Sequence, residues 1–98
     1  MTITHYLDGS TLVLAIAGRI DTQTSPQLET ALNDLLEKAN SLVLDFKGVD
    51  YLSSAGLRVL LSIQKRMDAR GGMKLVNVIS AVREVFEITG FIDFLTIE

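Results

Sequence analysis

Two adjacent serines in the stretch YLSSAGLRVLL, residues 51–61, are the side chains with the clearest chemical potential in this chain. Ser53 and Ser54 stand where an extended segment gives way to leucines at helical spacing. A hydroxyl at a helix start can accept a hydrogen bond from a free backbone N–H, which is the ordinary capping role. It can also carry a phosphoryl group, because the N-terminus of a helix favours anions. We expect at least one of the two serines to cap the helix.

A phosphoryl group at this position would change the surface and spare the fold. It adds roughly −1.5 to −2 charge near neutral pH. A partner carboxylate about 4 Å away would feel roughly 1 to 4 kcal/mol of repulsion per charge, which is about a fivefold to thousandfold change in affinity. The small residues Ala55 and Gly56 are expected to leave room for a kinase or a partner backbone. From spacing alone, the pattern favours a simple helix start over a phosphorylation switch.

The other residues with catalytic or metal-binding potential do not predict an active site. His5 is the only histidine and there is no cysteine, so a Ser-His-Asp site would depend on His5, which nothing in the sequence places near the serines. The serines lie in no GxSxG elbow, and the glycines form neither a GxGxxG nor a GxxxxGK[ST] loop. Three carboxylates lie near the ends of predicted strands without the spacing of a calcium loop, namely Asp21, Asp45 and Asp50. We expect no enzyme activity, no metal site and no cofactor.

The length and net charge further restrict the class of protein and its possible partners. Ninety-eight residues with 48% hydrophobic and 21% charged side chains fit one globular domain, residues 1–98. The net charge of −3 and the absence of a basic stripe disfavour nucleic acid as a partner. No apolar run approaches the roughly 20 residues of a membrane helix, and no secretory signal is recognised. We therefore expect a cytoplasmic protein without a membrane partner.

Hydrophobic periodicity predicts alternating strands and helices. Strands are expected at residues 2–6, 10–17, 41–46 and 73–76, with a hairpin turn at Asp8-Gly9 and residues 47–50 leading out of the third strand. Helices are expected from a Ser25 cap with Pro26 at the first position, from about residue 54 to 69, and from a Ser80 cap to Gly90. Residues 91–97 fit a short helix or strand. The order predicts an α/β fold, a small mixed sheet with an initial hairpin and then βαβ units, flanked by helices.

The chain resembles the STAS domain family over essentially its whole length, and within it the stand-alone anti-sigma factor antagonists of bacteria. The resemblance lies in GRID (residues 18–21), in LVLDFKGVDYLSSAGLRVLL (residues 42–61) and in LVNV with VREVFEITGF (residues 75–91). The central segment is the most specific of the three. This resemblance implies a small mixed sheet flanked by helices and a role in partner switching.

Partner switching implies particular partners. In the family, the unphosphorylated antagonist binds an anti-sigma factor that is also a GHKL-type serine kinase, and so frees the sigma factor. The kinase then phosphorylates the antagonist and the complex dissociates, and a PP2C-type phosphatase resets it. The family acceptor lies two residues before the glycine of the motif, which here is Ser54, counted back from Gly56. Asp21 resembles the family aspartate near the acceptor, and Leu57 and Arg58 resemble part of the partner-facing surface.

One position departs from the family pattern. Many sporulation and stress antagonists have an aspartate directly before the acceptor serine, and here that residue is Ser53. Two hydroxyls are therefore available, and Ser54 is the favoured acceptor with Ser53 as runner-up. The alternative function is a non-switching STAS subunit of another assembly, such as a lipid-transport or stress-sensing complex. A nucleotide binder using Asp21 and Ser54 is a further alternative, which the missing phosphate loop disfavours.

Overall fold

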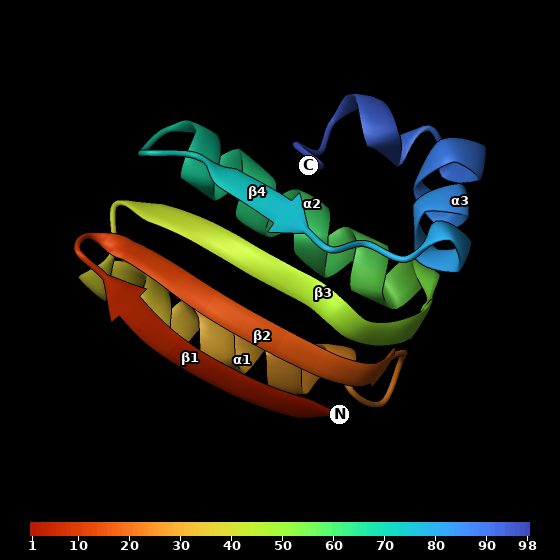
Figure 1. Ribbon diagram of the computed structural model, residues 1–98, viewed down its shortest axis with the longest axis horizontal. Coiled ribbons are helices and arrows are strands. Elements are labelled where there is room, and N and C mark those ends of the chain that lie inside the picture. The colour runs from red at the N-terminus through yellow and green to blue at the C-terminus, as the bar shows by residue number, and fades with distance from the viewer.

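The computed structural model describes all residues, 1–98, and contains one four-stranded sheet with strand order β1-β2-β3-β4 (Figure 1). The elements in chain order are β1 (Thr2–Asp8), β2 (Thr11–Ile20), α1 (Ser25–Leu35), a 3₁₀ turn (Leu36–Lys38), β3 (Ser41–Leu52), α2 (Ser54–Asp68), β4 (Met73–Val76), α3 (Ser80–Thr89) and a second 3₁₀ turn (Phe91–Asp93). β1 pairs antiparallel with β2, whereas β2 with β3 and β3 with β4 are parallel. The predicted mixed sheet, with its initial hairpin and βαβ units, is confirmed.

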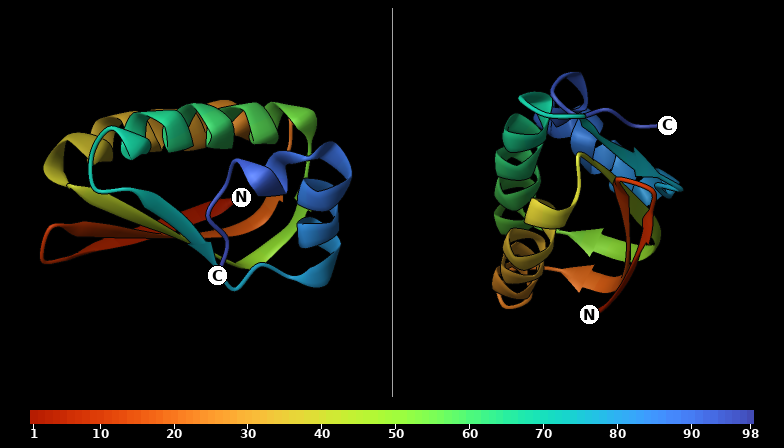
Figure 2. Two further views of the ribbon diagram at one scale, coloured as in Figure 1. Left: turned by 90° about the horizontal axis from the view of Figure 1, so that it is seen from above. Right: turned by 90° about the vertical axis from the view of Figure 1, so that its left-hand side faces the viewer.

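The core lies between the sheet and two helices. Figure 2 shows α1 and α2 side by side over one face of the sheet, with α3 across one end. Alternate residues of β2 and β3 point into this layer, because successive side chains of a strand face opposite ways. Leu14, Leu44 and Phe46 are fully buried there. Phe86 of α3 packs on Phe46, with ring centroids 6.5 Å apart, which holds α3 against β3.

Strand β3 is longer than predicted, and this is the difference that matters for the site. Residues 47–50 were expected to leave the sheet, but the strand continues to Leu52 by pairing with Gly18–Ile20 of β2 through two register shifts. Gly48 permits this close pairing, because a Cβ there would lie 2.7 Å from that of Ala17. A lysine, a glycine and an aspartate within four residues are typical of a loop, and only the neighbouring strand holds this stretch extended.

Three local predictions were wrong in detail. The hairpin loop is Gly9-Ser10, one residue later than predicted, with Gly9 at φ 62°. Ser25 is the first residue of α1 and does not cap it; its buried hydroxyl donates to the carbonyl of Asp21 at 2.5 Å. Ser80 is likewise the first residue of α3, and Ile79 occupies the cap position without a side-chain bond. In both helices, the serine predicted as the cap is the first helical residue, one position after the actual cap.

The C-terminal segment combines both structures that the sequence allowed. Phe91–Asp93 form the 3₁₀ turn after Gly90, whose φ of 79° ends α3 as predicted. Ile97 then forms a single parallel bridge with Leu75 on the outer edge of β4. None of the helices is both long and apolar enough to cross a membrane.

Candidate functional site

The two serines have different places at the start of α2. Ser53 is the N-cap: its backbone is extended, and its half-buried hydroxyl accepts a hydrogen bond from the Gly56 N–H at 3.4 Å. Ser54 is the first helical residue, and its exposed side chain makes no hydrogen bond within the protein. Capping fixes the Ser53 side chain toward the helix. The hydroxyl that remains free is that of Ser54.

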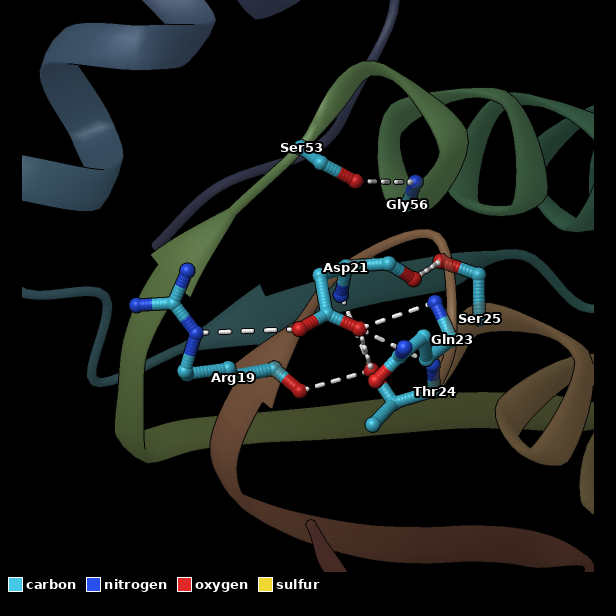
Figure 3. Close-up of polar contacts among 7 residues, drawn as sticks. All are labelled: Arg19, Asp21, Gln23, Thr24, Ser25, Ser53 and Gly56. Carbon is cyan, nitrogen blue, oxygen red and sulfur yellow. Dashed lines mark hydrogen bonds and ion pairs between the residues drawn. The ribbon is translucent and has the colours of Figure 1, made fainter.

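The ends of β2 and β3 bring GRID and the serines together. Ile20 pairs with Leu52, and the Ser53 N–H donates to the Ile20 carbonyl at 2.9 Å. Asp21 follows Ile20 directly, so it enters its turn beside the residue that caps α2 (Figure 3). The predicted proximity of Asp21 to the serine pair therefore has a structural cause, which is the extended pairing of β3. His5 lies on β1, at the far edge of the sheet.

Asp21 organises the turn between β2 and α1. Its Oδ1 accepts hydrogen bonds from the backbone N–H groups of Gln23 and Thr24, both at 3.0 Å, and the Thr24 hydroxyl lies 3.1 Å away. Its Oδ2 lies 3.6 Å from the Arg19 guanidinium (Figure 3). The Thr24 backbone bond is the largest cause that lowers the pKa of Asp21 below its ordinary value, with smaller contributions from the Thr24 hydroxyl, Gln23 and Arg19. The carboxylate is held ionised by the turn that it shapes.

Replacing Asp21 with asparagine is expected to destabilise the protein in a pH-dependent way. Because the folded pKa of Asp21 is lowered, its contribution is complete above the ordinary carboxyl pKa of about 3.9 and is lost as pH falls through the folded value. Urea unfolding of wild type and Asp21→Asn, from about pH 7 to about pH 3, should show a stability difference that is constant near neutral pH and begins to narrow below the ordinary carboxyl pKa. Asp34→Asn, at an exposed position of α1, is the control and should follow wild type throughout. Equal stability at neutral pH would contradict the assigned role.

Gly56 and Leu57 serve the packing of α2 and are not part of its exposed face. A Cβ on Gly56 would lie 2.6 Å from Leu52 Cδ1 and 2.7 Å from Ile20 Cγ2, so the helix start presses on the ends of β2 and β3. Leu57 is only 4% exposed. We predicted that the small size of Gly56 leaves room for a partner on the exposed face of α2. That prediction was wrong, because Gly56 faces the strand ends beneath the helix. The glycine is small because of what lies beneath the helix.

Arg58 and a shallow hollow complete the exposed surface beside Ser54. Arg58 is exposed, makes no ion pair and follows Ser54 by four residues, which places both on one face of α2. The hollow, of about 370 Å³, lies between the first turns of α1 and α2. It is lined by Thr22, Ser25, Pro26, Glu29, Ala55, Arg58 and Val59.

Arg19 and Tyr51 also belong to this region, and the sequence reasoning missed them. The Arg19 guanidinium lies over the Tyr51 ring, 3.9 Å from its centroid, and Tyr51 remains 42% exposed. The two residues are partners in the β2–β3 register. The sequence could have indicated this pair, because each residue directly precedes the buried last residue of its strand. That signal becomes readable only once β3 is known to extend to Leu52.

The fold is that of a small mixed α/β domain, and the comparisons with known proteins identify its family. The STAS domain model matches residues 3–98. The chain is 37% identical to BtrV of Bordetella bronchiseptica, over 93% of this chain and 79% of that protein. It is 36% identical to the anti-sigma-B factor antagonist of Bacillus subtilis, over 84% of this chain and 76% of the relative.

A solved structure shows the same arrangement. The crystal structure of an anti-sigma factor antagonist from Mycobacterium paratuberculosis superposes with a TM-score of 0.88 at 26% identity, covering 98% of this chain and 83% of that one. The chain belongs to the STAS domain family. The names of these relatives describe antagonists of regulatory proteins and not enzymes.

Proposed function

We propose that this protein is an anti-sigma factor antagonist whose binding is switched off by phosphorylation of Ser54. One observation carries the choice of residue: Ser53 is engaged as the cap of α2, whereas Ser54 is exposed and its hydroxyl is free. A kinase needs an accessible hydroxyl, and only Ser54 offers one without loss of the cap. The relatives named as antagonists support the class of function.

A phosphate on Ser54 would be accommodated by the folded domain. It would lie at the N-terminus of a helix of 15 residues, where free N–H groups and the helix dipole favour negative charge. Arg58, one helical turn further on and without an ion pair, is within the spacing at which opposite charges attract on a helix. Modification therefore changes the charge of the surface without opposing the structure beneath it.

The same surface explains how binding would be lost. In the unmodified protein Arg58 is free to meet a carboxylate of the anti-sigma factor, and the hollow beside it can receive a side chain. Arg19 and Tyr51 extend this surface across the ends of β2 and β3. A phosphate on Ser54 would both repel an acidic partner and occupy Arg58. We propose that these two effects together release the partner.

The proposed partners follow from this cycle. The anti-sigma factor is expected to be the serine kinase itself, of the GHKL type, with ATP as phosphoryl donor. A PP2C-type phosphatase is expected to remove the phosphate and restore binding. Asp21, Ser53, Gly56 and Leu57 act in this scheme by positioning the helix start, and Ser54 and Arg58 by contact.

The proposal is tested by mass spectrometry after incubation with ATP and a GHKL-type anti-sigma factor kinase of the same organism. Wild type is expected to gain one phosphate, which maps to the peptide that contains Ser54. Ser54→Ala should gain none. Ser53→Ala is the matched control: it should still be phosphorylated, while losing about 1 kcal/mol of stability with the cap.

Each other result has a definite meaning. Phosphate that disappears only in Ser53→Ala would keep the switch and overturn the assignment to Ser54. A folded protein that binds the kinase without gaining phosphate would favour the alternative, a non-switching STAS subunit of another assembly. Absence of both binding and phosphate with every kinase of this type would contradict the antagonist function itself.

A further inference from the structure

The two edges of the sheet are treated differently by the fold. The outer edge of β4 is covered by the C-terminal segment: the Leu75 N–H donates to the Thr96 carbonyl at 2.8 Å, and the Glu98 N–H donates to the Leu75 carbonyl at 2.9 Å. β1 forms the opposite edge, and its only strand partner is β2. No other element lies beyond β1 in Figure 1. The backbone groups on the outer side of β1 therefore face solvent.

The hairpin register identifies these free groups. The two-residue loop is closed by the pair Asp8 and Thr11. In an antiparallel hairpin the closing pair exchanges both hydrogen bonds, and every second residue after it does the same. The residues between, Ile3, His5 and Leu7, then direct their N–H and C=O groups outward. β1 thus offers a regular row of donors and acceptors.

β1 lacks the features that usually protect an edge strand. It contains no lysine and no proline, and its pairing with β2 runs without a bulge over all seven residues. Its side chains are mainly β-branched, aromatic or aliphatic, and Tyr6 and Leu7 are 62% and 49% exposed. Soluble proteins normally interrupt or cover such an edge, because it is a template for another strand. Here only the β4 edge is covered.

We infer that β1 is a dimer interface that pairs antiparallel with β1 of a second copy, about a two-fold axis at His5. This register opposes the outward-facing residues to one another, Ile3 to Leu7 of the second copy and His5 to itself. It joins apolar to apolar side chains, and it opposes Asp8, the one carboxylate of the strand, to Thr2. About six backbone hydrogen bonds would form, two for each outward-facing pair. The pairing is self-complementary, as a two-fold interface requires.

The dimer would leave the switch surface accessible. α2 packs over β3 and β4, whereas β1 lies at the other side of the sheet (Figure 1). Joining two four-stranded sheets through β1 therefore does not cover Ser54 or Arg58. Each dimer would present two copies of the proposed binding surface.

Sedimentation equilibrium of the full chain tests this inference, at concentrations from about 10 μM to about 1 mM. Wild type is expected to approach twice the chain mass of 10.7 kDa. Leu7→Lys and His5→Pro should remain monomeric, since the first places a charge at the edge and the second removes an outward N–H. A wild type that stays monomeric throughout overturns the inference.

A surface control and a local readout make the result specific to β1. Ile88→Lys changes a residue that is 78% exposed on α3, and it should dimerise like wild type. If Ile88→Lys abolishes the dimer while Leu7→Lys retains it, the interface lies elsewhere and the inference is wrong. Amide hydrogen exchange gives a test without substitution. The N–H groups of Ile3, His5 and Leu7 should become protected as concentration rises, and unchanged exchange in a dimeric sample would also overturn it.

Discussion

Replacing Ser54 with glutamate is expected to weaken binding to the anti-sigma factor by between about fivefold and about a thousandfold. The substitution adds a charge at the first residue of α2, next to a surface that we propose meets an acidic partner group. It also gives Arg58 an opposite charge four residues away, and so removes the cation proposed to contact the partner. Isothermal titration calorimetry with the purified anti-sigma factor measures the change directly.

The controls separate charge from shape. Ser54→Ala should bind about as tightly as wild type, because the free hydroxyl makes no hydrogen bond that the fold requires. Ser54→Gln has nearly the shape of glutamate without its charge and should lose much less affinity than Ser54→Glu. Thermal unfolding should show that all three variants fold. Equal binding by Ser54→Glu and wild type would contradict the electrostatic switch, whatever the mass spectrometry shows.

Replacing Gly56 with alanine is expected to destabilise the protein, although the same change usually stabilises a helix. In an open helix, alanine is more favourable than glycine by about 0.5 to 1 kcal/mol. At Gly56 the added Cβ meets Leu52 and Ile20 at 2.6 and 2.7 Å, and the Ile20 carbonyl at 3.3 Å. Extra carbon atoms in a tightly packed site cost about 1 to 3 kcal/mol. The overpacking cost should exceed the helix gain, and Gly56→Val should lose more than Gly56→Ala.

Urea unfolding, with a second alanine substitution in α2 as control, shows whether Gly56→Ala stabilises or destabilises the protein. Ser62→Ala lies at an exposed position of the same helix and should be neutral or slightly stabilising. Gly56→Ala should lower the free energy of unfolding relative to both wild type and Ser62→Ala. A stabilised Gly56→Ala would mean that α2 does not press on the strand ends as described. The position of Ser54 depends on this contact, because the contact fixes where the helix begins.

The class of fold and the helix start that carries the two serines could be predicted from the sequence alone. Helical spacing of leucines after residue 54 and alternating apolar residues in the strands follow from the periods of the two structures, which are local properties. The serines at the helix start, the glycine after α3 and the early hairpin were readable for the same reason. The resemblance of residues 42–61 to the STAS family then pointed to Ser54, and the family is confirmed.

Tertiary contacts determine which serine is the cap, how far β3 extends and which residues Gly56 packs against. Ser53 and Ser54 have equal capping ability as residues, and the bond from Ser53 N–H to Ile20 selects between them. Residues 47–50 read as a loop because their extended conformation comes from pairing with β2, which lies some 30 residues earlier in the chain. Contacts between distant segments leave no local period, so the sequence could indicate the proposed switch region but not the geometry that leaves one hydroxyl free.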